Sequence, residues 1–144
     1  QGSSAQFSSP SGVAVDKDGN VLVADRKNQR IRQITPDGTV TTIAGSGTAG
    51  LDDGTASSAR FHDPYGIGVG PDGSIFVADL VNNMIRKIAT DGTVTALADS
   101  GAGFQDGAAV TAKFNNPTDD AIDASGNIFV ADMSNRRIRK IYVK

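Results

Sequence analysis

The sequence predicts an all-β protein built from a repeated unit, and three observations predict it. Nearly the same sequence segment occurs three times, as "VLVADRKNQRIRQI", "IFVADLVNNMIRKI" and "IFVADMSNRRIRKI". Phe7, Phe61 and Phe114, which precede these segments at a fixed distance, lie 54 and then 53 residues apart. The apolar segments are short, rich in β-branched residues and separated by turns that contain Gly and Asp, and the sequence has no sustained helical period. The chain is therefore an array of three equivalent units.

Each unit predicts antiparallel strands in chain order. In the first unit "GVAVD" and "NVLVAD" flank the hairpin signal "KDG", "RIRQI" follows the turn "DRKN", and "PDG" leads into "TVTTIAG". Four strands in this order form a meander of about 35 residues. The third unit ends in "RIRKIYVK" without a counterpart of "TVTTIAG", so we expect its sheet to lack the outer strand.

The apolar pattern predicts how these sheets pack. "VLVA" and "IFVA" are apolar at consecutive positions, so both faces of each sheet are expected to be buried. A β-sandwich buries one face of each strand and would alternate more sharply. Sheets stacked radially, each covered by a neighbour on both sides, match the pattern. The sequence thus predicts a β-propeller in a single array, with blades at about residues 7–45, 61–99 and 114–144.

Residues 10–32, which read "PSGVAVDKDGNVLVADRKNQRIR", resemble the NHL repeat, a propeller blade motif, and the resemblance extends over nearly the whole chain. It implies a ring of six blades and a recognition scaffold. Three blades would leave two broad apolar faces bare, which monomers rarely tolerate. We therefore expect a homodimer of three plus three blades, closed around a two-fold axis. An engineered or excised piece of a longer chain is the alternative.

In a meander, the turn after the second strand lies at the same end as the joint to the next blade. Long loops on a rigid scaffold often carry function, so we expect ligands at this end. A basic band runs along it, and its binding-face candidates are Arg26, Lys27, Arg30, Arg136 and Arg137. The band suggests anion or RNA binding. The interpretation we prefer is that acidic joint residues pair with it, since no aromatic residues are interleaved with the basic ones. These acids are Asp52, Asp53, Asp63 and Asp106.

Two further sets of polar residues are candidates. An Asp and an Asn three residues apart recur in every unit, as Asp25 and Asn28, Asp79 and Asn82, and Asp132 and Asn135. We interpret them as structural turn residues, with each Asp accepting backbone N–H bonds in its own turn and each Asn in a left-handed conformation. In contrast, Asp119 and Asp120 occur once, in the innermost strand of the third unit. Asp120 takes the place of Val13 and Ile67, so we expect it to face the central channel. Asp119 and Asp120 are therefore both binding-face candidates for a polar or cation site, and a solvated channel entrance is the alternative.

Catalytic and metal chemistry has little support in the sequence. The chain has no cysteine, and His62 is its single histidine, so neither a thiolate site nor a three-histidine centre can form within one chain. "DKDGN" at Asp16 resembles half a calcium loop, but a strand follows at once, and a hairpin turn explains it better. We expect no catalytic residues, no bound metal and no cofactor.

The resulting functional hypothesis is a non-catalytic binding or structural scaffold that presents loops to a protein or glycan. The alternatives are a propeller enzyme of the lyase or lactonase type with an axial metal, and an anion- or RNA-binding face. The net charge is −2 and no long apolar run is present, so we expect neither a nucleic-acid nor a membrane partner. The Gly-rich joints resemble those of extracellular or multidomain NHL proteins, which implies an extracellular or periplasmic location.

Overall fold

The computed structural model describes residues 2–98, 101–106 and 108–142, and they form three antiparallel sheets. The first sheet contains β1 (Val13–Val15), β2 (Val21–Asp25), β3 (Arg30–Ile34) and β4 (Val40–Ala44). The second contains β5 (Pro64–Val69), β6 (Ile75–Asp79), β7 (Met84–Ile88) and β8 (Val94–Ala98). The third contains β9 (Pro117–Ile122), β10 (Ile128–Asp132) and β11 (Arg137–Ile141). The described residues also form short 3-10 helices: η1 (Gly2–Ser4), η2 (Arg26–Asn28), η3 (Ala109–Thr111) and η4 (Met133–Asn135).

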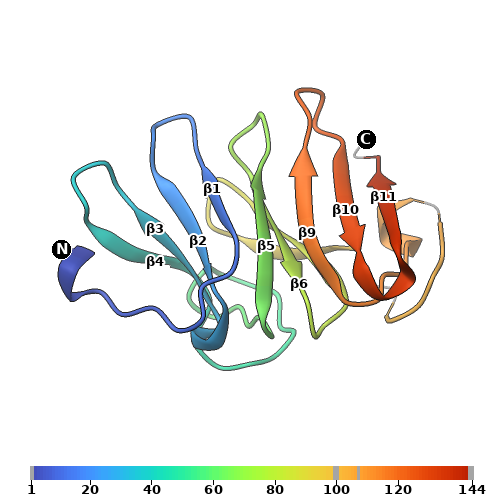
Figure 1. Ribbon diagram of the computed structural model, residues 1–144, viewed down its shortest axis with the longest axis horizontal. Helices are drawn as coiled ribbons and strands as arrows, with labels where there is room; N and C mark the ends of the chain where they lie inside the picture. Colours follow the sequence, from blue (N-terminus) through green and yellow to red (C-terminus); the bar gives the residue numbers. More distant parts are fainter. Residues whose placement is uncertain (1, 99–100, 107, 143–144) are drawn as a thin grey trace.

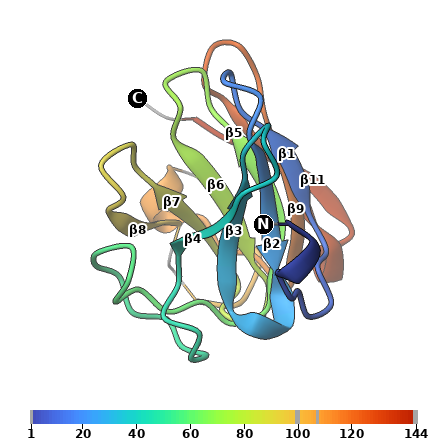
Figure 2. The ribbon, with the colours of Figure 1, turned by 90° about the vertical axis from the view of Figure 1, so that its left-hand side faces the viewer.

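Each sheet is a meander in which consecutive strands pair. The three sheets stand side by side, with the second between the first and the third (Figure 1), and the view turned by 90° shows them one behind another (Figure 2). The β1–β2, β3–β4, β5–β6 and β9–β10 hairpins lie at one end, which we call the hairpin end. The turns after the second strands lie at the opposite end, which we call the joint end because the first joint begins and ends there, as predicted. The middle of the first joint runs back along β8, where Gly54 bridges Val94. No helix among the described residues is long and apolar enough to cross a membrane.

Both faces of the second sheet are buried, which explains the apolar pairs along its strands. Between the first two sheets, Leu22 and Ala24 of β2 pack in one cluster with Val77 of β6. Between the second and third sheets, Phe76 and Ala78 of β6 pack with Val130 of β10. Alternate residues of β6 therefore point into two different interfaces between neighbouring blades, which we call seams. This stacking of blades excludes the two-layer sandwich.

The outer faces of the first and third blades are bare in the described structure. Val13 and Val15 of β1 are 68% and 64% exposed. Ile138 of β11 is 73% exposed, whereas Ile31 and Ile85, its counterparts in the other blades, are fully buried. We call the face with Val13 and Val15 the first flank and the face with Ile138 the last flank. Burial at these positions depends on a neighbouring blade, not on the residue type.

Glycines let the innermost strands approach one another closely. A Cβ atom added to Gly12 would lie 2.5 Å from the carbonyl oxygen of Tyr65. A Cβ atom added to Gly66 would lie 2.5 Å from the Cα atom of Asp119. Side chains are excluded at such distances because backbone cannot move aside cheaply. The equivalent position in the third blade is Asp119 itself, so the last flank does not offer the same close approach.

Candidate functional site

A buried polar network ties each joint to the blade that follows it. In the second blade the carboxylate of Asp79 is fully buried. Its Oδ1 atom accepts the backbone N–H of His62 at 2.8 Å. Its Oδ2 atom accepts the amide of Asn82 at 2.8 Å and Nη1 of Arg86 at 3.1 Å. One carboxylate thus gathers three donors, and each is strengthened by its negative charge.

Arg86 extends this network into the preceding joint. Its guanidinium is fully buried and donates to the carbonyl oxygens of Arg60 and Asp52, at 2.9 and 3.0 Å. It also pairs with Asp53 at 2.6 Å. The guanidinium lies 5.2 Å from the centre of the Phe61 ring, a distance that permits a cation–π contact. The joint therefore folds back over its blade around one arginine.

The same arrangement occurs in the other two blades. Asp25 accepts the N–H of Ser8, the amide of Asn28 and the guanidinium of Arg32. Asp132 does the same with Asn115, Asn135 and Arg139. Phe7 and Phe114 lie against Arg32 and Arg139 as Phe61 lies against Arg86. We call this recurring set of Phe, Asp, Asn and Arg the joint lock.

The joint lock corrects the predicted role of the Asp and Asn residues. The N–H groups that the aspartates accept come from the joint, 17 residues earlier, and not from the turn of each Asp. In these turns the left-handed residues are Gln29, Asn83 and Arg136, each of which directly follows the Asn. The Asn instead donates its side-chain amide to the Asp. A signal for this was present in the sequence, since an Arg stands seven residues after each of the three aspartates.

The acidic joint residues pair with basic residues, as the preferred interpretation of the basic band predicts. Arg26 and Lys27 both contact Asp63 at 2.9 Å. Burial raises the pKa of Asp63, but hydrogen bonds from Lys27 and Arg26 outweigh that effect and hold the pKa below its ordinary value. Arg60 pairs with Asp52, and Arg139 pairs with Asp106. Much of the basic charge on the joint end is therefore neutralised within the chain.

Of the remaining basic candidates, Arg30 points toward the carbonyl of Ser46 at 3.5 Å, and Arg136 is exposed on its turn. The guanidinium of Arg137 lies 4.4 Å from the ring of Phe104. No aromatic residue is interleaved with the basic band in the sequence, but in the folded chain aromatic rings do lie against its arginines, so the expectation of a band without aromatic residues is wrong. The joints bring Phe104 and the three lock phenylalanines against arginines that are distant in sequence.

The two adjacent aspartates of β9 point in different directions. Asp119 is exposed and helps to line a hollow of about 400 Å³ at the start of the innermost strands, together with Ser11, Tyr65 and Thr118. Asp120 is only 6% exposed, and both of its carboxyl oxygens lack a hydrogen-bond partner. Burial, followed by the charge of Asp119, raises the pKa of Asp120 to about 7.

The prediction that Asp120 faces the channel is wrong. Asp120 pairs with Val130 in the sheet, and its Oδ2 atom lies near Gly68, so its side chain enters the seam between the second and third blades. The reason is the two-residue period of a strand, which sends neighbouring side chains to opposite faces. In the described part of the chain no three His, Cys, Asp or Glu side chains are grouped as a metal site.

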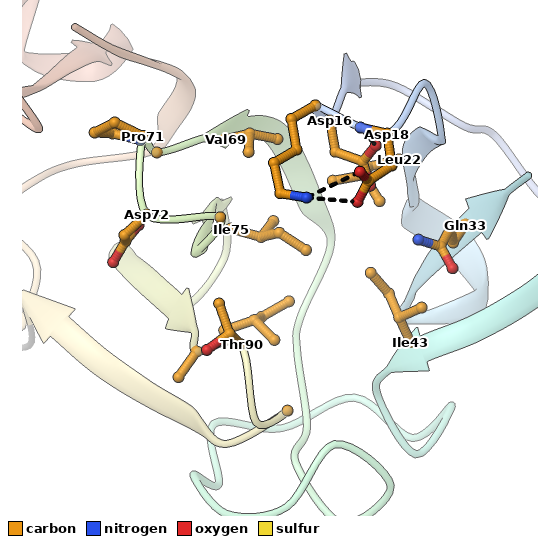
Figure 3. A pocket seen from close by; sticks show the side chains of 16 residues that line it. Asp16, Asp18, Leu22, Gln33, Ile43, Val69, Pro71, Asp72, Ile75 and Thr90 are labelled. Atoms are coloured by element: carbon orange, nitrogen blue, oxygen red, sulfur yellow. Dashed lines mark hydrogen bonds and ion pairs between the residues drawn. The ribbon is translucent and has the colours of Figure 1, made fainter. Parts of the chain in front are cut away.

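A cleft that no sequence motif indicates opens at the hairpin end, between the first and second blades (Figure 3). Its volume is about 420 Å³. Leu22 and Ile43 of the first blade face Val69 and Ile75 of the second across it. Because its walls come from two blades, no single sequence segment indicates it.

Comparison with known proteins agrees with this geometry. The family model described as "NHL repeat" matches residues 7–34. Protein SUPPRESSOR OF QUENCHING 1 of Arabidopsis thaliana is 38% identical over 80 residues, which is 55% of this chain and 8% of that protein. A structural genomics protein of unknown function from Bacteroides thetaiotaomicron is 29% identical with a TM-score of 0.85, over 95% of this chain and 36% of that one. An auxiliary nutrient binding protein of the same organism is 25% identical with a TM-score of 0.81, over 90% and 36% of the two chains. This chain therefore spans about a third of these structures and a small part of the curated relative.

Proposed function

Because this chain carries an NHL repeat at residues 7–34 and builds a propeller-like stack of blades, we propose that it is a non-catalytic binding scaffold. In this proposal two copies join flank to flank, three blades plus three, and present the loops of the joint end to a protein or glycan ligand. Both parts rest on the described residues, the first on the flanks and the second on the joints.

The observation that carries the proposal is the joint lock. Most of its donors and acceptors are used inside the fold, where each carboxylate holds three partners, and among the described residues of the lock only the Nε atoms of Arg32 and Arg86 are buried without one. A motif whose polar groups are mostly paired internally serves rigidity, and a rigid frame reduces the entropy that loops lose on binding a ligand. The joint 45–63 and the described parts of the second joint, 101–106 and 108–116, are the long loops that this frame holds in place. The nutrient binding protein of similar structure supports a binding role.

The two flanks support the pairing because their residue types match a seam that is already formed. In the seam between the first and second blades, Ile67 and Val77 pack against Ile31. Val13 and Val23 are the counterparts of Ile67 and Val77 on the side of the first flank, and Ile138 is the counterpart of Ile31 on the last flank. Val23 is already buried within one chain, so a second copy would bring the exposed Val13 to Ile138 in the way that Ile67 meets Ile31.

Asp119 makes the proposed seam differ from the internal ones. Gly12 and Gly66 allow the innermost strand of the next blade to approach within contact of the backbone. Asp119 carries a side chain at that position and would hold the neighbouring strand farther away. We therefore expect the seam between copies to be wider near the axis and weaker than the seams within one chain.

We expect light scattering on the 144-residue chain to give a mass near twice 14.8 kDa. Ile138→Lys should produce a monomer, since it places a charge in the centre of an apolar seam. The matched control is Leu51→Lys, which changes another exposed apolar residue, in a joint away from both flanks. Asp119→Gly should tighten the pair, because it restores the close approach. A wild-type chain that stays monomeric at high concentration would overturn the pairing.

The binding part has a separate test. We expect hexasaccharides such as cellohexaose or xylohexaose, or a peptide library, to shift the amide resonances of the joint residues in an NMR titration. The control is the set of β3–β4 and β9–β10 hairpin residues, which lie at the opposite end and should not shift. Turnover of glucono-1,5-lactone in the presence of divalent metal would contradict the non-catalytic assignment.

A further inference from the structure

The cleft at the hairpin end has the composition of a binding site for a small molecule. Five apolar side chains form its floor: Leu22, Ile43, Val69, Ile75 and Ile88. Polar side chains surround them at the rim: Asp16, Lys17, Asp18, Gln33, Asp72 and Thr90. Figure 3 shows the apolar groups of both blades facing the same space, with Asp16 and Asp18 at its edge. The ammonium of Lys17 pairs with Asp18. A volume of about 420 Å³ lies within the range of small-molecule sites.

At the cleft, the first blade carries Leu22 where the second blade carries the larger Phe76. Leu22 pairs with Gln33 across β2 and β3, and the equivalent pair in the second blade is Phe76 with Lys87. Phe76 is buried in the seam between the second and third blades, with the Lys87 ammonium 5.9 Å from its ring centre. A phenyl ring therefore occupies in the second seam the position that only Leu22 occupies in the first.

The rim favours cations. Three carboxylates and one ammonium group line it. Burial raises the pKa of Asp16, but hydrogen bonds from Asn20 outweigh this and leave it below its ordinary value. The backbone N–H of Ser74 lowers the pKa of Asp72. These two carboxylates are ionised at neutral pH. Lys17 pairs with Asp18 at 2.9 Å and Lys87 pairs with Asp72 at 3.8 Å, so three carboxylates face two ammonium groups and the rim keeps a net negative charge.

We propose that this cleft binds a small amphipathic cation, with an aliphatic or aromatic body on the floor and a protonated amine at the acidic rim. The floor is too apolar to bind a fully polar ligand well, and the rim disfavours an anion of the same shape. Gln33 and Thr90 add neutral hydrogen-bonding groups at the edge. Both walls belong to one chain and lie at the hairpin end, so this site does not depend on the pairing of two copies or on the joint-end ligand.

The test compares two probes with similar alkyl chains and head groups of opposite charge, n-octylammonium and n-octanoate, titrated at neutral pH and followed by NMR. Octylammonium should shift residues of the cleft and bind about tenfold more tightly than octanoate, with a preference that weakens in high salt. Asp72→Asn should reduce that preference severalfold. The matched control is Asp91→Asn, because Asp91 also accepts a backbone N–H in a hairpin turn but does not line the cleft.

Leu22→Phe tests the location, since it copies into the first blade the residue that the second blade already uses. We expect it to weaken octylammonium binding at least about tenfold while circular dichroism stays unchanged. If Leu22→Phe does not fold, the comparison of Asp72→Asn with Asp91→Asn is the deciding test of the site. Equal binding of the two probes, no shift at millimolar octylammonium, or full affinity in a folded Leu22→Phe variant would overturn the proposal.

Discussion

Replacing Asp79 with alanine is expected to destabilise the chain by about 3–5 kcal/mol, the usual cost of leaving a buried charge without its partner. Arg86 would keep its positive charge in a fully buried position, and the N–H of His62 and the amide of Asn82 would lose their acceptor. Domains of this size have a total stability of about 5–15 kcal/mol, so the loss is a large fraction of it. Urea unfolding followed by circular dichroism measures the change.

Three comparisons separate the buried charge from other effects. Asp91→Ala removes an exposed turn aspartate and should cost well under half as much. Asp25→Ala should also cost less than Asp79→Ala, because its partner Arg32 is partly exposed and remains hydrated. Adding Arg86→Met to Asp79→Ala should recover part of the loss, since the unpaired charge is gone. An Asp79→Ala variant within about 1 kcal/mol of the parent would show that the joint lock does not hold the blade.

The second large effect concerns Asp120, whose pKa is raised to about 7 in the folded chain from 3.8. Below about pH 4 the carboxyl is protonated in both the folded and unfolded states. Between about pH 4 and 7 the unfolded state releases the proton and the folded state keeps it, so the free energy of unfolding falls as the pH rises. The loss amounts to about 4 kcal/mol and is complete above pH 7, because one pKa unit corresponds to about 1.4 kcal/mol.

Asp120→Asn removes this titration with little change in shape. We expect the difference in unfolding free energy between Asp120→Asn and the parent to be constant below about pH 4 and to grow in favour of the variant up to about pH 7. Asp120→Val should be more stable still, since Val13 occupies the same position in the first blade and carries no unpaired polar group. Asp119→Asn is the control, and it should move the midpoint to lower pH without abolishing the dependence. A difference that does not vary with pH would show that Asp120 is ionised in the folded chain.

The strands and their order could be predicted because their signals are local. The segments "KDG" and "PDG" specify hairpin turns within a few residues, and segments rich in β-branched residues specify the strands between them. The burial of both faces of a sheet could also be predicted, since consecutive apolar residues in "IFVA" leave no polar face. The stacking of blades follows from that property.

The joint lock and the cleft could not be predicted in the same way. The lock joins Asp79 to His62 and Arg86 to Asp53, pairs that lie 17 and 33 residues apart. The repeat placed an Arg at a constant distance from each Asp, but it gave no information about which joint atoms would meet them. For Asp120, the strand period left two directions open, and the position of the second blade selected one.

The sequence by itself therefore determined the repeat, the meander and the need for a blade on each side of a sheet, because turn chemistry and hydrophobic periodicity act between near neighbours. The tertiary structure alone decided that Asp120 is buried without a hydrogen-bond partner, that arginines hold the joints, and that Leu22 lines a cleft between the first two blades while Phe76 is buried between the second and third. These outcomes depend on how two blades come together, and side-chain volume and charge take effect there between residues that the chain keeps far apart.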